Sequence, residues 1–132
     1  MSFETLRLSV ETQFNSSWTG TASSVDHGGN HDFTPPDGTP WVRLTTNVIG
    51  NENAQIGADF QRATGVITVQ CFVKKDTGEK VLNEMIDEVS GIFQNKNFGG
   101  VRCFTTTPIR IGEIESWYQV NAKTDFHFDV FS

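Results

Sequence analysis

Cysteine and basic residues are scarce in this chain of 132 residues, and each scarcity excludes a class of function. The two cysteines, Cys71 and Cys103, lie in strand-like runs and form no Cys-x-x-Cys pair. We therefore expect buried free thiols rather than a disulfide, a redox site or a thiolate metal site. Ten basic against sixteen acidic residues give a net charge of −6, whereas a nucleic-acid grip needs clustered Lys and Arg.

Long apolar runs and leader-like segments are missing as well. Because no run of about 18 apolar residues is present, we expect no membrane span. The N-terminal residues do not show the basic stretch followed by an apolar one that is typical of a signal peptide, so we expect none. The hydrophobic fraction of 36% predicts a modest core, to which eleven Phe and three Trp add large buried areas. The length predicts one domain over residues 1–132.

Alternation of apolar and polar residues predicts four strands. Successive side chains of a strand point to opposite faces, so a half-buried strand shows a period of two. In the first expected strand, Val42, Leu44 and Val48 share the face that we expect to be buried. Pro108 is expected to end the third strand, with a continuation after a bend, and the fourth is unusually long. The expected strands cover residues 41–49, 66–73, 101–107 and 117–130.

Two segments have helical periodicity. Residues 2–14 place four apolar side chains on one side, and Asp76 with Glu79 can form a capping box that opens a second helix. The second helix ends by the polar, glycine-containing stretch 97–100. We predict an α+β fold, a mostly antiparallel twisted sheet with two helices packed on one face. The apolar stripes are Phe3, Leu6, Val10 and Phe14 in the first helix, and Val81, Leu82, Met85, Ile86, Val89, Ile92 and Phe93 in the second.

Two long connections interrupt these elements. Residues 15–40 are rich in Ser, Thr, Gly, Asp and Pro and predict an irregular loop. Residues 50–65 exceed a tight hairpin and predict a protruding arm or long hairpin. Its apolar residues either tuck back onto the domain or anchor a neighbouring subunit. The candidate interface residues are Gln55, Ile56, Asp59, Phe60 and Arg62.

Catalytic patterns are weak throughout. His27, His31 and Asp32 could bind a metal ion, but they lie in a glycine-rich loop and lack the helical spacing of a zinc-protease site. Glu113 and Glu115 are close in sequence, yet catalytic carboxylates need an enclosed pocket that shifts a pKa. The sequence therefore predicts no enzyme, no cofactor and a function in binding or assembly.

Four motifs give the chain a family resemblance. Phe14 and Trp18 form an aromatic pair after the first helix, and a Pro-Trp-Val-Arg-Leu strand occupies residues 40–44. A polar glycine arm then leads into Val-Ile-Thr-Val-Gln at residues 66–70, and a Gly-Glu-Lys helix opens at Gly78. In these features the chain resembles the tail-terminator proteins of long-tailed bacteriophages and related tail-like particles.

The resemblance implies a role and a set of partners. Such proteins form hexameric rings at the head-proximal end of the tail, assembled in the host cytoplasm. The ring caps the tail tube, stops its polymerisation and offers the docking surface for the head-completion or connector protein. The genome passes through the central hole without specific binding, and the acidic balance fits a lumen that repels phosphate.

Two alternatives stay open at the level of the sequence. One is another virion connector or a tail-tube subunit, since these also use small sheet-and-helix scaffolds. The other belongs to a different class, a ligand-binding module with an exposed Trp41 or Trp117 as a stacking platform.

Overall fold

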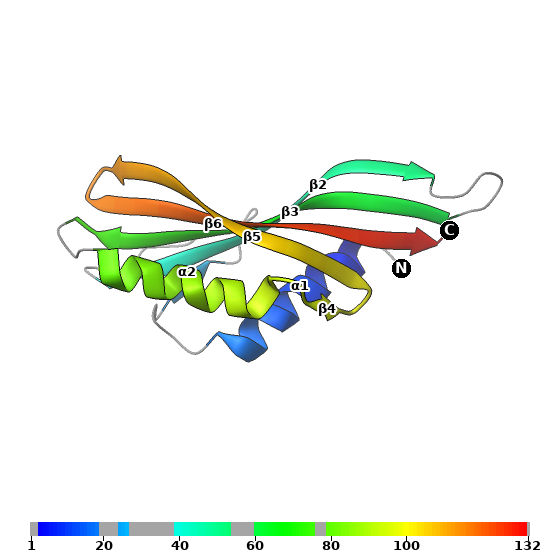
Figure 1. The fold of residues 1–132 in the computed structure, drawn as a ribbon, viewed down its shortest axis with the longest axis horizontal. Helices are drawn as coiled ribbons and strands as arrows, with labels where there is room; N and C mark the ends of the chain where they lie inside the picture. The colour runs from blue at the N-terminus through cyan, green and yellow to red at the C-terminus, as the bar shows by residue number, and fades with distance from the viewer. Residues whose placement is uncertain (1–2, 19–23, 27–38, 54–59, 76–78, 132) are drawn as a thin grey trace.

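A twisted sheet with two helices on one face makes up the molecule (Figure 1). The computed structural model describes residues 3–18, 24–26, 39–53, 60–75 and 79–131. The elements are, in chain order, α1 (Phe3–Ser17), β1 (Ser24–Asp26), β2 (Trp41–Asn53), β3 (Phe60–Lys74), α2 (Glu79–Phe93), β4 (Asn97–Phe98), β5 (Val101–Ile114) and β6 (Trp117–Phe131).

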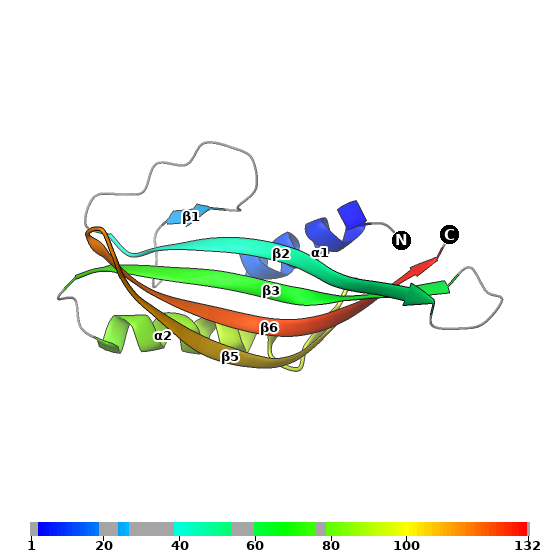
Figure 2. The same cartoon turned by 90° about the horizontal axis from the view of Figure 1, so that it is seen from above.

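The sheet has six strands in the order β1-β2-β3-β6-β5-β4. All neighbours are antiparallel except β1, which runs parallel to the start of β2. The central strands β3 and β6 pair along their whole length, from Phe60 opposite Phe131 to Lys74 opposite Trp117. Figure 2 shows β2 and β5 near opposite margins of the twisted sheet. The predicted α+β fold is confirmed.

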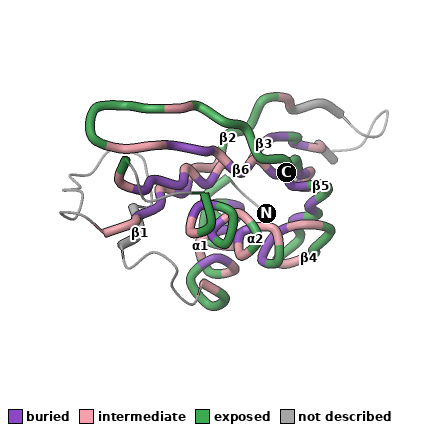
Figure 3. Tube along the Cα trace, turned by 60° about the vertical axis from the view of Figure 1, so that its left-hand side comes forward, coloured by how far each residue is buried: buried purple, intermediate pink, exposed green. Residues whose placement is uncertain are grey.

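The core lies between the sheet and the helices, where buried residues gather in Figure 3. Three of the four apolar residues predicted for α1 are buried, and the ring of Phe14 stacks on Phe93 of α2 with centroids 6.1 Å apart. The ring of Trp18 also stacks on Phe14, with centroids 5.0 Å apart. Phe3 is the exception, with half of its surface exposed, because it lies at the outer end of the helix. The stripe of α2 is buried or half-buried throughout.

The predicted arm is mostly strand. β2 continues to Asn53 and β3 begins at Phe60, so residues 50–53 and 60–65 of the predicted arm are strand, and residues 54–59 lie outside the described residues. This extension pairs with β6, and Ala63 within it is buried together with its register partner Phe128. The prediction that Val48 is buried is wrong, because Val48 lines an open groove between α1 and β2 and is 39% exposed.

Two further predictions are wrong in part: the end of the third strand at Pro108, although its continuation over residues 109–111 is found, and the irregular loop over residues 15–40. β5 runs through Pro108 to Ile114, because β4 covers only its first two residues and a proline on an open edge removes no bond to a neighbour. Residues 15–40 are not wholly irregular, since α1 extends to Ser17 and Ser24–Asp26 forms β1. The composition of that segment hid a three-residue strand that pairs with Trp41 to Arg43.

Candidate assembly surfaces

A three-stranded ribbon extends beyond the helices where the ends of β2, β3 and β6 lie side by side (Figure 1). Arg62 of β3 pairs with Asp129 of β6, with 2.9 Å from Nε to Oδ1. This carboxylate raises the pKa of the guanidinium, and the pair fixes Arg62 against its own sheet. Of the other predicted interface residues, Phe60 begins β3, and Gln55, Ile56 and Asp59 lie outside the described residues.

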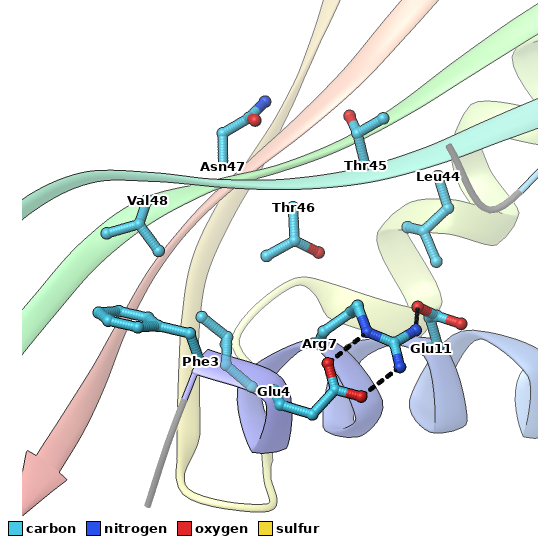
Figure 4. A pocket seen from close by; sticks show the side chains of 10 residues that line it. Phe3, Glu4, Arg7, Glu11, Leu44, Thr45, Thr46, Asn47 and Val48 are labelled. Carbon is cyan, nitrogen blue, oxygen red and sulfur yellow. Dashed lines mark hydrogen bonds and ion pairs between the residues drawn. The ribbon is translucent and has the colours of Figure 1, made fainter. Parts of the chain in front are cut away.

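A groove separates α1 from β2 and has a volume of about 610 Å³ (Figure 4). Its apolar lining comes from both elements, with Phe3 and Leu6 on the helix and Leu44 and Val48 on the strand. The backbone of β2 borders the groove from Leu44 to Val48. A helix beside an edge strand is the setting in which an added strand or a neighbouring edge can bind.

Arg7 spans the helical wall of this groove. Its Nε lies 2.8 Å from Glu4 Oε1, and its other nitrogens contact the carboxylates of Glu4 and Glu11. The hydrogen bond from Arg7 lowers the pKa of Glu4, although such exposed pairs contribute little to stability. Their effect is to hold three charges in a row along the rim of the groove.

Exposed apolar side chains gather on the two marginal strands. β2 exposes Val48 and Ile49, and Ile49 is 72% exposed, the largest fraction among the large apolar residues described. Sequence reasoning missed these residues, although Val48 and Ile49 break the alternation of the strand by standing side by side. On β5 the corresponding residues are Phe104, Ile109, Ile111 and Ile114.

An aromatic cluster occupies the sheet face opposite the helices. The rings of Trp41 and Phe72 stack with centroids 4.0 Å apart, and Trp117 meets Trp41 edge-on at 6.1 Å. Arg43 lies over the Trp41 ring and Lys74 over the Trp117 ring. Because Trp41 is only 4% exposed, the alternative of an exposed Trp41 as a stacking platform is wrong.

Charge is divided between the two faces of the protein. The register of the strands places more basic than acidic residues on the open face of the sheet, whereas α2 carries four acidic residues and one basic residue. The net charge of −6 therefore does not predict the sign of any one surface. The described charged residues of the open face are Arg43, Arg62, Lys74, Arg102, Lys123, Asp125 and Asp129.

Reactive groups do not converge on a site within the described ranges. No group of three or more potential metal ligands occurs among these residues, and the weak candidates His27, His31 and Asp32 lie outside them. Both cysteines are buried and free as predicted, and burial raises the pKa of each thiol to about 12. The described surfaces offer a groove and strand edges against which another protein can pack.

Comparison with known proteins gives these surfaces their context. The model of a family described as phage tail terminator protein matches residues 5–121. The chain belongs to the phage tail terminator family. This tail terminator is accordingly a structural component of the virion tail with partners in tail assembly, and it is not an enzyme.

Solved structures agree on the fold. A chain from the virion of a native gene transfer agent particle is similar at 14% identity with a TM-score of 0.64, covering 95% of each chain. A second solved structure is similar with a TM-score of 0.66 at 14% identity, and the match covers 100% of this chain and 99% of the other. A search of curated proteins found no match. Neither described helix is long and apolar enough to cross a membrane.

Proposed function

We propose that this tail terminator caps the head-proximal end of a tail tube as a hexameric ring. The ring ends tube polymerisation, presents the surface to which the head-completion or connector protein binds, and lets the genome pass without specific binding. The family match over residues 5–121 is the observation that carries the proposal.

The shape of the protein supports a role between two assemblies. The helices cover one part of the sheet, and the ribbon formed by β2, β3 and β6 extends past them (Figure 1). Each strand of that ribbon is hydrogen-bonded to a neighbour, so it can reach a partner without the ordering cost of a loose loop. We propose that the hairpin end, with Gln55, Ile56, Asp59, Phe60 and Arg62, contacts a neighbouring subunit or the tube.

Negative-stain imaging of purified tail tubes mixed with this chain tests the capping role. We expect added density at one tip of each tube, and tubes so capped should no longer elongate when tube subunits are supplied. Density distributed along the tube would instead favour a tube subunit. Density bound only to heads would favour another connector.

Substitution of the hairpin apolar residues tests the proposed contact. Ile56→Ser combined with Phe60→Ser should leave the monomer folded and abolish tip binding. Val66→Ser is the matched control, because Val66 faces the open side of the same strand within the body of the sheet. Loss of the folded state in the double variant, measured by circular dichroism, would show that these residues pack on their own domain.

A further inference from the structure

Two open edges border the sheet. On one side, β1 pairs only with the first three residues of β2, so the side of residues 44–53 that faces away from β3 has no paired strand in the described structure. On the other side, β4 pairs with the first two residues of β5, and Lys96 and Asn95 bind the backbone of Cys103 and Phe104, so the open part of the β5 edge begins after Phe104. Figure 2 shows these strands on opposite sides of the sheet. We call α1 with residues 44–53 the α1–β2 margin, and residues 94–114 the β5 margin.

Both margins expose apolar side chains of the kind that associate. The α1–β2 margin offers Phe3 and Val48 in the open groove and the exposed Ile49 next to Val48 on β2, and the β5 margin offers three isoleucines. An exposed strand edge with apolar side chains is a template for another chain. Because six of the eight exposed large apolar residues described lie on these two strands, the margins are the best placed surfaces for a contact between subunits. The three isoleucines are Ile109, Ile111 and Ile114.

The two margins carry opposite charge. Among its described side chains, the α1–β2 margin has Glu4 and Glu11 against Arg7, a net charge of −1. The β5 margin has three basic residues against Glu113, a net charge of +2 in a chain whose total is −6. Like margins of two copies therefore repel one another and unlike margins attract, which favours a head-to-tail contact over a symmetric one. The basic residues of the β5 margin are Lys96, Arg102 and Arg110.

The β5 edge is only partly available for backbone pairing. The backbone N–H of Thr106 donates to Gln94 Oε1 at 3.1 Å, and Pro108, two residues further, has no N–H to offer. The register of β5 also shifts at two places, between Cys103 and Thr106 and between Arg110 and Gly112. Such features protect an edge from indiscriminate pairing. Side-chain packing and charge must therefore supply most of the contact, with few backbone hydrogen bonds.

We propose that the α1–β2 margin of one subunit binds the β5 margin of the next copy of this chain. The inference rests on the proposed ring, and it names the two surfaces that join its subunits. A head-to-tail contact between unlike surfaces generates a closed ring when the rotation between subunits divides a full turn. The isoleucines of β5 fill the groove beside Phe3 and Val48, and the acidic rim of the groove faces the basic residues of the neighbour.

Chemical cross-linking in assembled particles tests the contact. Ile49→Cys and Ile111→Cys place one thiol on each margin at side chains that are 72% and 47% exposed. The native thiols do not compete, because both are buried with a pKa of about 12. With both substitutions in one chain, a short bis-maleimide should yield a ladder of linked subunits that ends at the ring number. A mixture of the two single variants should yield dimers.

Two controls keep the result specific. Asn83→Cys with Ile111→Cys puts the first thiol on the exposed side of α2, away from the proposed contact, and should give no ladder. Dimers from Ile49→Cys alone would show symmetric pairing and overturn the inference. The inference would also be overturned if the double variant is found at the tips of tails of normal length and yet gives no cross-linked product. That result would leave the capping role intact. Absence of the chain from tails would contradict the capping role itself.

Discussion

The ring of Phe126 on β6 lies across the backbone of Gly65 on β3. The two residues are register partners, and a Cβ atom added to Gly65 would come within 2.8 Å of the Phe126 ring and closer still to the backbone oxygen of Asn47 on β2. The register of β2 shifts at this point, between Val48 and Gly50. Glycine thus permits a close approach of three strands where the ribbon leaves the body of the sheet.

Gly65→Ala should destabilise the fold by about 1–3 kcal/mol, because the added methyl group overlaps a backbone atom that cannot move alone. Gly91→Ala is the matched control. It lies in α2 with nothing within 4 Å of the new methyl group, so it should stabilise by about 0.5–1 kcal/mol. Urea unfolding of both variants measures the difference. Equal stabilities would mean that the strands are not so closely packed at Gly65.

A buried pair of threonines joins β5 to β6. The Oγ1 atoms of Thr106 and Thr124 lie 2.7 Å apart, and both residues are buried. Thr106→Val leaves the hydroxyl of Thr124 without this partner and should cost about 1–3 kcal/mol. The double variant with Thr124→Val should recover part of that loss, since both polar groups are then removed. Additive losses in chemical denaturation would show that the two hydroxyls do not interact.

His127 should make stability depend on pH near neutrality. Partial burial lowers its pKa most, and the positive charges of Arg62 and Arg102 lower it further, whereas Asp129 raises it. The unfolded chain then binds the proton more readily than the native one below about pH 6.5, so the free energy of unfolding falls as the pH falls through the native pKa. His127→Gln should remove this part of the slope between pH 7.5 and 5.5. If the free energy of unfolding of the variant depends on pH as steeply as that of the native protein, groups other than His127 cause the dependence.

The sequence predicted the helices and strands that bury one face in the core and expose the other. Alternation located β2, β3 and β6, and the helical stripe of α2 matched its buried face, because burial leaves a periodic pattern. The ends of β2 and β3 escaped detection because the buried positions of β3 there hold the small residues Ala63 and Gly65, which give no pattern of large apolar side chains. β1 was missed because a strand of three residues is too short to show alternation of apolar and polar side chains. The passage of β5 through Pro108 could not be predicted because it depends on which side of the strand lacks a neighbouring strand.

The candidate surfaces were harder to predict than the fold. The sequence identified a segment with apolar residues, but a groove forms only when α1 and β2 are brought together from opposite sides of a long connection. The exposed isoleucines of β5 look like core residues until the sheet order places them at a margin. The aromatic cluster of Trp41, Phe72 and Trp117 likewise depends on the pairing of three strands.

Tail length in particles that lack this chain tests the central claim most directly. Electron microscopy of particles produced with and without the protein gives the distribution of tube lengths and the fraction of tails joined to heads. If the chain ends tube growth and forms the head-binding surface, its loss should produce headless tails and tubes longer than the normal length. Tails of normal, uniform length joined to heads in its absence would contradict the account.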